Sequence, residues 1–550
     1  MRTGRVGVRA LAMTARDASS ALIVTAARGA LAALAVSRGA LAALAITAAL
    51  PALAAETFDV GLAGNGTRID ALAVPGPAAD APTVLLVGGL DGDDATAAAV
   101  RAAIANYEKL RARDRAFNLV AVPVANPERA PLEFPPTGVA YREHSESHAL
   151  WRWIGAHGPD LVLIAGGAPV GGAPAGSAPA EVLAVALSGQ PVAGIGKIPS
   201  RRWTSNDELR TLRAADVPMS EAHRELARRA ARSPRALAEE LAQHYGHDFD
   251  PPWYIGAIAL IARIKLGQID DVRRIVEPYV DGTKDSLASP SSLVLGGHIV
   301  FTELARLTHD PRYVAAVRKV GDLGFEPDGQ MKESMPYHQE FSDSIFMGTA
   351  IVAQAGALTG DRKYFDMAAR HLAFMQKLDL RADGLYRHQP ATDAAWGRGN
   401  GFAALGLTLT LAELPHDHAA YASTLASYRS LMAALLPYQD RDGLWRNVID
   451  YPGAYAELSG TAMIGYALAR GMREGWISGR EYKRAISRAW SAVNARVASS
   501  GDLVDVCEST ARMTSLEQYV RRAAILGPDP RGGAMAMLLA TELMQAATPR

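Results

Sequence analysis

The sequence contains a single cysteine, Cys507, among its 550 residues. An intramolecular disulfide is therefore impossible, and the fold must be stabilised by burial of apolar side chains. The sequence also lacks an excess of charge of either sign, with 57 basic and 57 acidic residues, and no lysine or arginine cluster is interleaved with aromatic residues. Because nucleic-acid binding needs such a basic surface, we expect no nucleic-acid partner.

Acidic residues are almost absent from residues 1–55, where Asp17 is the only one. This region carries scattered arginines and ends in the apolar run RGALAALAITAALPALAAE, with an A-x-A pattern ending at Ala54. These features are typical of a secretory signal peptide. A membrane helix is the alternative, but Pro51 interrupts a run that is already short for a bilayer span. We expect a signal peptide region at 1–55 and a periplasmic or secreted mature protein that is not bound to the membrane after cleavage.

The rest of the chain divides into two parts with different sequence patterns. Residues 56–205 alternate β-rich runs such as TVLLVGGL and NLVAVPVANP with helical runs such as ATAAAVRAAIANYEKLRA. This alternation predicts a doubly wound α/β domain with a parallel sheet. Residues 206–250 are charged and helical in pattern, and we expect them to form a linker. In residues 251–550, apolar residues recur mostly at the spacing of α-helices. We therefore predict a multidomain protein whose second domain is all-α.

The helical part contains an internal repeat. The segments GHIVFTELARLTHDPRY and GTAIVAQAGALTGDRKY align without gaps and end at Tyr313 and Tyr364, 51 residues apart. Looser copies end at Tyr421 and Tyr482. Repeated helical hairpins of this length build either an open solenoid or a closed α/α toroid. In a toroid, Asp343 would lie at the pocket end of an inner helix.

Six motifs in this part follow one another along the chain: SDSIFMG, ALTGDRKYFD, DGLYRH, WGRGNGFAALGL, LPYQDRDGLW and YAELSGTAM. Their order resembles that of the unsaturated glucuronyl and rhamnogalacturonyl hydrolases, glycoside hydrolase families 88 and 105. The resemblance implies an (α/α)6 toroid that needs no metal or organic cofactor. It also implies the substrate of a polysaccharide-degrading glycosidase, an oligosaccharide produced by a lyase and carrying a 4,5-unsaturated uronic acid at its end.

Such a sugar is a vinyl ether, so its hydrolysis requires a proton at ring carbon C4 and then water at C5. One acid that later accepts a proton from the water is sufficient. By similarity to the family, Asp343 is this acid/base. The apolar neighbours Phe341, Ile345 and Phe346 would favour its proton-bearing form. The alternative is that Asp343 only caps a helix, a common role for aspartate.

The same resemblance places His388 and Arg398 against the uronate ring, and the planar guanidinium suits a carboxylate. Trp396 and Trp445 either stack on the sugar or belong to the core of the toroid. Glu457 precedes another inner helix, where it either lines the pocket or caps that helix.

The sequence also departs from the family pattern. Members commonly carry a second acidic residue one repeat before the catalytic one, and the repeat places Ser292 at that position. Two tryptophans of the family are replaced by Phe341 and Phe402. A rival interpretation is therefore a catalytically inactive toroid that binds glycans.

The motifs VLLVGGLDGDDATAAAV, VAVPVANPERA and HSESHALWRWI of the first part resemble a zinc carboxypeptidase domain. Zinc hydrolysis requires three protein ligands and an open position. Asp91 and Asp94 stand where that family has histidine and glutamate, and no histidine lies near Ala165. We therefore expect a degenerate scaffold, with Asp91, Asp94 and Glu146 as the remaining candidate ligands. A metallopeptidase or amidase is the rival interpretation.

Overall fold

The computed structural model describes residues 55–92, 94–166 and 178–546. The signal peptide predicted at 1–55 lies outside the described residues except for its last position. Among the helices that the structure describes, none combines the length and apolar character that a bilayer span requires.

The first domain contains a six-stranded sheet in the order β1-β2-β4-β3-β5-β6. Its strands are β1 (Glu56–Leu62), β2 (Arg68–Val74), β3 (Thr83–Val87), β4 (Asn118–Val122), β5 (Leu161–Ile164) and β6 (Ser200–Arg202). Strands β4, β3, β5 and β6 are mutually parallel, as the alternating pattern predicted.

The prediction of a parallel sheet is wrong for β1 and β2, which run antiparallel to each other and join β4 in an antiparallel pair. The reason is the short connection after β1, in which the amide of Ala63 donates to Thr67 O at 2.8 Å. A turn of this size reverses the chain, whereas parallel neighbours need a crossover of a dozen or more residues. The sheet is therefore mixed.

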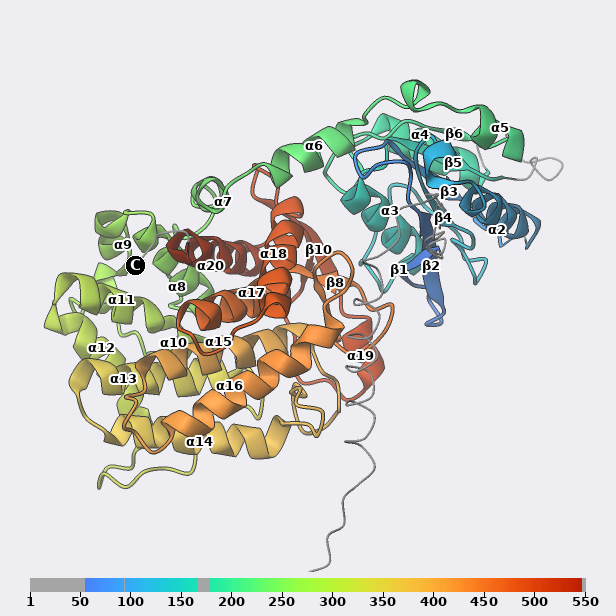
Figure 1. Cartoon of the computed structure of the whole chain (residues 1–550). Helices are drawn as coiled ribbons and strands as arrows, with labels where there is room; N and C mark the ends of the chain where they lie inside the picture. Colours follow the sequence, from blue (N-terminus) through green and yellow to red (C-terminus); the bar gives the residue numbers. More distant parts are fainter. Residues whose placement is uncertain (1–54, 93, 167–177, 547–550) are drawn as a thin grey trace, which may run out of the picture. The chain divides into compact units, whose positions relative to one another are not determined.

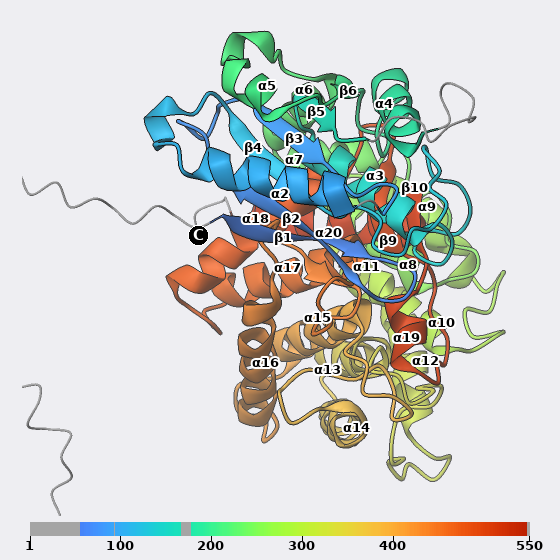
Figure 2. The ribbon, with the colours of Figure 1, turned by 90° about the vertical axis from the view of Figure 1, so that its right-hand side faces the viewer.

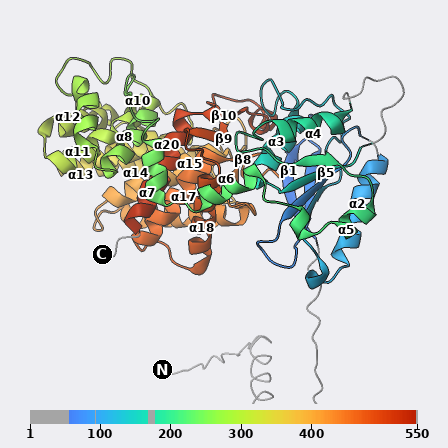
Figure 3. The ribbon, with the colours of Figure 1, turned by 90° about the horizontal axis from the view of Figure 1, so that it is seen from above.

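Helices cover both faces of this sheet. One apolar cluster joins one face to α3 (Ser145–His157) and α4 (Pro179–Gly189). A second cluster joins the opposite face to α2 (Asp94–Glu108) and α5 (Asn206–Thr211). In Figure 2, α2 lies in front of the strands, and Figure 3 shows α3 and α4 on the other side of the sheet. This is the layered arrangement expected of an α/β domain.

Helices dominate the second domain (Figure 1). Its inner helices are α8 (Tyr254–Lys265), α10 (Ser292–Gly297) with α11 (Ile299–Thr308), a π-helix (Ile345–Ala350) with α13 (Ile351–Thr359), α15 (Gly397–Glu413), α17 (Leu458–Arg473) and α20 (Pro530–Ala546). Each packs on the next, and α20 also packs on α8, so the ring closes. The structure therefore shows a closed toroid and excludes the open solenoid.

A second layer of helices lies outside this ring. It consists of α7 (Pro234–Leu241), α9 (Ile269–Val276), α12 (Pro311–Gly321), α14 (Lys363–Asp379), α16 (Tyr421–Leu435) and α18 (Arg480–Ala495). The remaining elements are α6 (Glu221–Ala230), α19 (Leu516–Val520) and the strands β7 (Trp445–Arg446), β8 (Ala456–Glu457), β9 (Asp502–Cys507) and β10 (Ala524–Pro528).

The internal repeat corresponds to two equivalent connections, each leading from an inner helix to the outer helix that follows it. At the first, Asp310 Oδ1 accepts the backbone N–H of Arg312 at 2.9 Å. At the second, Asp361 Oδ1 accepts the backbone N–H of Lys363 at 3.1 Å. Each aspartate satisfies an amide at the start of an outer helix, which explains why it recurs at the same place in the repeat.

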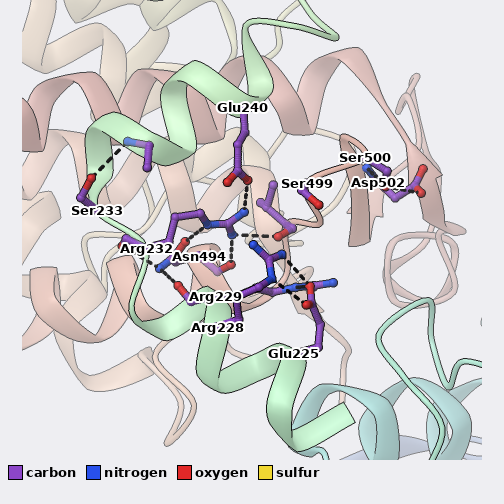
Figure 4. A network of polar contacts seen from close by, with 12 residues as sticks. Glu225, Arg228, Arg229, Arg232, Ser233, Glu240, Asn494, Ser499, Ser500 and Asp502 are labelled. Atoms are coloured by element: carbon purple, nitrogen blue, oxygen red, sulfur yellow. Dashed lines mark hydrogen bonds and ion pairs between the residues drawn. The ribbon is translucent and has the colours of Figure 1, made fainter. Parts of the chain in front are cut away.

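The predicted linker, 206–250, is anchored to the toroid through arginines (Figure 4). Arg232 donates to Asn494 O at 2.7 Å, to Val497 O at 2.8 Å and to Glu240 Oε2 at 2.6 Å. Helix α7, within the same segment, packs on α20. The second half of the expected linker is thus part of the toroid wall.

An ion pair joins the α/β domain to strand β9. Arg152 Nη1 lies 2.6 Å from Asp505 Oδ1, with the two side chains 5% and 10% exposed. Arg152 also donates to Ala524 O on β10 at 3.1 Å. A desolvated pair with this geometry depends on both partners, since removing one leaves a buried charge without compensation.

Candidate active site

A cavity of about 340 Å³ lies where the amino ends of several inner helices meet. Residues at or beside the starts of α8, α10, the π-helix, α15 and α20 line it: Trp253, Tyr254, Ser291, Ser292, Asp343, Ser344, Trp396, Arg398 and Arg531. Ser509 and Thr510, which follow β9, also contribute. Because helix amino ends carry partial positive charge, this arrangement favours an anionic ligand.

Asp343 is the only carboxylate among the described residues that line this cavity. Its side chain is 16% exposed, and Oδ2 lies 3.4 Å from Nε2 of His388. Oδ2 is buried and has no hydrogen-bond partner among the described residues. The main-chain carbonyl of Asp343 accepts the amides of Phe346 and Met347, as at an N-cap position, but its carboxylate accepts no backbone N–H in the part of the chain that the structure describes. The geometry therefore contradicts the alternative in which Asp343 is only a helix cap.

A π-helix begins directly after Asp343, spanning Ile345–Ala350. A Cβ atom at Gly348 would lie 2.5 Å from Nε2 of His371, so only glycine allows this close approach. The same nitrogen lies 3.0 Å from Ser344 Oγ. Burial lowers the pKa of His371 to about 3, which keeps the ring neutral. His371 and Gly348 thus fix the backbone beside Asp343, and π-helical turns often occur at functional sites.

His388 is held between aromatic rings. It stacks on Phe341 with a centroid distance of 4.4 Å and meets Trp396 edge to face at 4.6 Å. Its Nδ1 lies 2.7 Å from the hydroxyl of Tyr519. Burial raises the pKa of Tyr519 to about 12, so the phenol keeps its proton and can donate it to Nδ1. That hydrogen bond selects the tautomer with Nε2–H facing Asp343.

Arg398 is fully buried and anchors the chain that follows β9. Nη1 donates to Cys507 O at 2.6 Å, and Nη2 donates to Glu508 O at 2.7 Å. Burial opposes its charged form, but the neighbouring Cys507 and Glu457 hold the pKa of Arg398 above its usual value. Its guanidinium lies 4.9 Å from the ring centroid of Trp396. Since Arg398 lines the cavity and its Nε has no partner among the described residues, this nitrogen remains free for a ligand.

The structure places Trp445 and Glu457 away from the lining of this cavity. Trp445 belongs to an apolar core, and its indole N–H donates to Leu435 O at 2.8 Å. Glu457 caps α17 and accepts the amides of Ser459 at 3.0 Å and Gly460 at 2.6 Å. For both residues, the non-binding alternative describes the observed contacts: core packing for Trp445 and helix capping for Glu457.

The two departures from the family pattern both lie at the cavity. Ser292, at the start of α10, lines it and occupies the position where a second acid was expected. Phe341 and Phe402 also line it. Phe402 packs edge to face on Tyr254 with a centroid distance of 5.3 Å. The cavity therefore keeps an aromatic wall without the two tryptophans.

A buried carboxyl, Asp379, lies near this site and was not anticipated from the sequence. Neither of its oxygens has a hydrogen-bond partner in the described structure. Burial, followed by the charge of Asp343, raises the pKa of Asp379 to about 8. Asp379 therefore carries a proton at neutral pH. Its sequence position, at the end of an outer helix, gave no sign of this environment.

The candidate zinc ligands of the first domain do not form a recognisable site. Asp91 and Asp94 are exposed, whereas Glu146 is buried and its Oε1 accepts the amide of Gly64 at 3.4 Å. In the described ranges, no group of three or more His, Cys, Asp or Glu side chains is placed to hold a metal ion.

A comparison with protein families gives a match to the profile described as Glycosyl Hydrolase Family 88, over residues 270–547. This match covers half of the chain. The chain belongs to glycosyl hydrolase family 88. The family 88 protein is therefore a glycoside hydrolase, and the matched residues include Asp343, His388, Trp396 and Arg398.

Curated relatives are similar over parts of the chain. An unsaturated rhamnogalacturonyl hydrolase of Bacillus subtilis is 28% identical over 268 residues, which cover 44% of this chain and 75% of the relative. An unsaturated 3S-rhamnoglycuronyl hydrolase of Alteromonas is 26% identical and covers 33% of this chain and 49% of that protein. Protein Atu3128 of Agrobacterium fabrum is 32% identical over 31% of this chain and 79% of its own.

Solved structures are similar at lower identity. A possible family 105 member from Salmonella enterica is 19% identical with a TM-score of 0.49, covering 57% of this chain and 93% of that one. An unsaturated glucuronyl hydrolase specific for heparin is 14% identical with a TM-score of 0.45, covering 58% of this chain and 97% of that one.

The protonated state of Asp379 predicts a pH-dependent stability. An acid whose pKa rises from 3.8 to about 8 on folding stabilises the fold fully below about pH 4 and loses this contribution as pH rises toward 8. Asp379→Asn removes the titration. The midpoint temperature of thermal unfolding of the wild type should be lower at about pH 8 than at about pH 5. For the variant, the difference between the two pH values should be smaller.

The matched control is Asp383→Asn, a partly exposed aspartate four residues further along the same connection. It should keep the wild-type pH dependence. Parallel pH profiles for the wild type and Asp379→Asn would contradict the assignment of a buried neutral acid.

Proposed function

We propose that the family 88 protein removes the 4,5-unsaturated uronyl residue, glucuronyl or galacturonyl, from the non-reducing end of lyase-generated oligosaccharides. The proposal rests first on the number of acids in the cavity. Hydrolysis of an ordinary glycosidic bond uses two carboxyl groups, one on each side of the bond. Here Asp343 alone lines the described cavity, and hydration of a vinyl ether needs only one.

The reaction proceeds in two proton transfers. Asp343 gives its proton to ring carbon C4, and the resulting positive charge is shared by C5 and the ring oxygen. Water then attacks C5 while the Asp343 carboxylate accepts its proton, which restores the acid. The product at C5 is a hemiketal. It opens to a ketone at C5 and a hemiacetal at C1, and this hemiacetal then breaks down to an aldehyde and releases the neighbouring sugar as an alcohol.

The cavity also suits the carboxylate of the uronyl ring. Arg398 and Arg531 line it, together with the amino ends of inner helices. Burial lowers the pKa of His338, the other basic residue at the wall, so this ring is neutral. The relatives named as unsaturated rhamnogalacturonyl and 3S-rhamnoglycuronyl hydrolases support the same substrate class.

The rival is a toroid that binds such sugars without turnover. Ser292 in place of a second acid is the observation that favours it. The loss of ultraviolet absorbance of the conjugated double bond separates the two, because hydration removes the chromophore and binding alone does not.

Asp343→Asn tests the chemistry. The amide keeps the shape of the side chain but cannot deliver a proton, so turnover should fall at least about a hundredfold. The matched control is Asp361→Asn, the repeat aspartate that accepts the amide of Lys363, because it should keep its cap and normal turnover. Wild-type activity in Asp343→Asn would reject the assignment and make Glu340 the next residue to change.

Arg398→Lys tests the carboxylate contact. Lysine lacks the planar fork that reaches both the protein and the ligand, so KM should rise roughly tenfold while kcat changes less. The thermal midpoint reports separately on the lost bonds to Cys507 O and Glu508 O. A fall in kcat with an unchanged KM would instead assign Arg398 to the chemical step.

We also propose that the protein acts outside the cytoplasm, in the periplasm or after secretion. The basic and apolar pattern of residues 1–55 supports this location. Mass spectrometry of the protein expressed from its full-length gene should give a mature chain beginning near Ala55. An unprocessed chain confined to the cytoplasm would contradict export.

A further inference from the structure

His388 lies behind Asp343 and not against the space that a ligand would fill. The resemblance to the family implied that His388 faces the uronate ring, but His388 is not among the described residues that line the cavity. Its side chain has no exposed surface, and Nε2 lies 3.4 Å from Oδ2 of Asp343. His388 therefore acts on the reaction through Asp343.

The two facing atoms have no other partner. Both Nε2 of His388 and Oδ2 of Asp343 are buried, and neither has a hydrogen-bond partner among the described residues. Burying a polar atom without a partner costs free energy, so each atom is the natural partner of the other. Contacts between catalytic groups are often long before substrate binds and shorten in the complex.

The imidazole of His388 has a fixed orientation. Besides its contacts with Phe341 and Trp396, the ring meets Tyr519 edge to face at a centroid distance of 5.6 Å. A ring that is held on three sides keeps Nδ1 toward the phenol and Nε2 toward Asp343. The two ring nitrogens therefore have different and constant roles.

Tyr519 is itself fixed to the frame of the site. It is fully buried, and its main-chain carbonyl accepts Nδ2–H of Asn447 at 2.7 Å. The carbonyl of Asn447 accepts the amide of Gly397, the first residue of α15, at 2.7 Å. Tyr519 does not line the cavity, so its hydroxyl can influence a ligand only through His388.

The two oxygens of Asp343 are not equivalent. The side chain is 16% exposed and lines the cavity, whereas Oδ2 is buried, so Oδ1 is the oxygen that a ligand can reach. An oxygen that accepts a hydrogen bond uses a lone pair. With Nε2–H of His388 donating to Oδ2, the proton of the acid resides on Oδ1.

We propose that Tyr519 is a positioning residue, which acts through His388 to place the reactive proton of Asp343 on Oδ1. The inference rests on the proposed function and deepens it. The proton leaves Oδ1 for ring carbon C4, and the proton of the attacking water returns to the Asp343 carboxylate. Without the phenol, the imidazole can carry its proton on Nδ1. Nε2 then becomes an acceptor and holds the proton of Asp343 on Oδ2, away from the ligand.

Tyr519→Phe tests the proposal, because it keeps the aromatic ring and removes only the hydroxyl. Loss of the hydrogen bond to Nδ1 should let both tautomers of His388 form. We expect kcat to fall about tenfold. KM should stay unchanged, since neither Tyr519 nor His388 lines the cavity.

The matched control is Tyr428→Phe. Tyr428 is also fully buried, and its hydroxyl donates to Ala467 O at 2.7 Å within an apolar core that does not line the cavity. Each substitution removes one buried hydrogen bond, so both should lower the midpoint temperature of thermal unfolding by a similar amount. Only Tyr519→Phe should lower kcat. Equal kcat values in the two variants would overturn the inference.

His388→Gln shows whether the effect passes through the imidazole. A side-chain amide offers a donor to Asp343 but has no tautomers to select. In the His388→Gln background, Tyr519→Phe should therefore change kcat by less than about twofold. A full additional loss of activity would mean that Tyr519 acts by another route.

Nuclear magnetic resonance of the full chain with ¹⁵N-labelled histidine gives a readout that needs no turnover. The resonances of His388 are those that disappear in His388→Gln. The wild type should show a protonated Nε2 and an unprotonated Nδ1, and Tyr519→Phe should shift Nδ1 toward the protonated form. A wild-type His388 protonated on Nδ1 alone would overturn the inference.

The outcomes separate this inference from the proposed function. A normal kcat in Tyr519→Phe rejects the positioning role and leaves the proposed function intact. A wild type that hydrolyses no unsaturated uronyl substrate rejects the proposed function, and with it the role of Tyr519 in proton delivery.

Discussion

The buried guanidinium of Arg398 is the interaction on which the site depends. It starts from α15, supports the indole of Trp396 and donates to two successive carbonyls after β9. Glu457, the N-cap of α17, also holds this segment, because its Oε1 accepts the amide of Cys507 at 3.0 Å. Arg398 and Glu457 together therefore bind the starts of α15 and α17 to the segment after β9, which brings Ser509 and Thr510 to the cavity. A buried arginine in this position is stable only because its donors meet carbonyls and its charge meets Glu457.

The balance of charge around Asp343 follows from this arrangement. Arg398 and Arg531 face the cavity, Asp343 is the one carboxylate among the described residues that line it, and the nearby Asp379 is neutral at pH 7. Arg531 is also paired with the buried Asp529 at 2.9 Å. Under the proposed function, the two guanidinium groups and the helix amino ends attract an anionic sugar, and Asp343 is the single group that exchanges protons with it. The absence of the second acid at Ser292 is compatible with the proposed chemistry, because vinyl ether hydration needs one carboxyl group, whereas ordinary glycosidases use two.

Much of the architecture could be predicted from local patterns. The repeat ending at Tyr313 and Tyr364 indicated helical hairpins, and the motifs around Asp343 and Arg398 indicated which hairpin ends form the pocket. The antiparallel β1–β2 hairpin was missed because its strands have the same β-rich composition as the parallel ones, and only the short turn distinguishes them. Composition does not specify strand direction.

The roles of single residues were harder to predict where they depend on distant contacts. Tyr519 reaches His388 across 131 residues of sequence, and no spacing rule connects them. Trp445 and Glu457 lie within family motifs, yet their contacts are those of a core residue and a cap, since a motif records proximity to a site as well as direct contact with it. Asp379 could not be identified because its burial results from the packing of several helices.

The ion pair between Arg152 and Asp505 has a consequence for how this enzyme could be dissected. Asp505 lies two residues before Cys507, whose carbonyl holds Arg398. A shortened protein that keeps only the helical half would leave Asp505, within β9, without its counter-ion, two residues before the carbonyl that holds Arg398. The α/β half therefore serves as a structural support of the helical half, because Arg152 supplies the counter-ion of a buried carboxylate there.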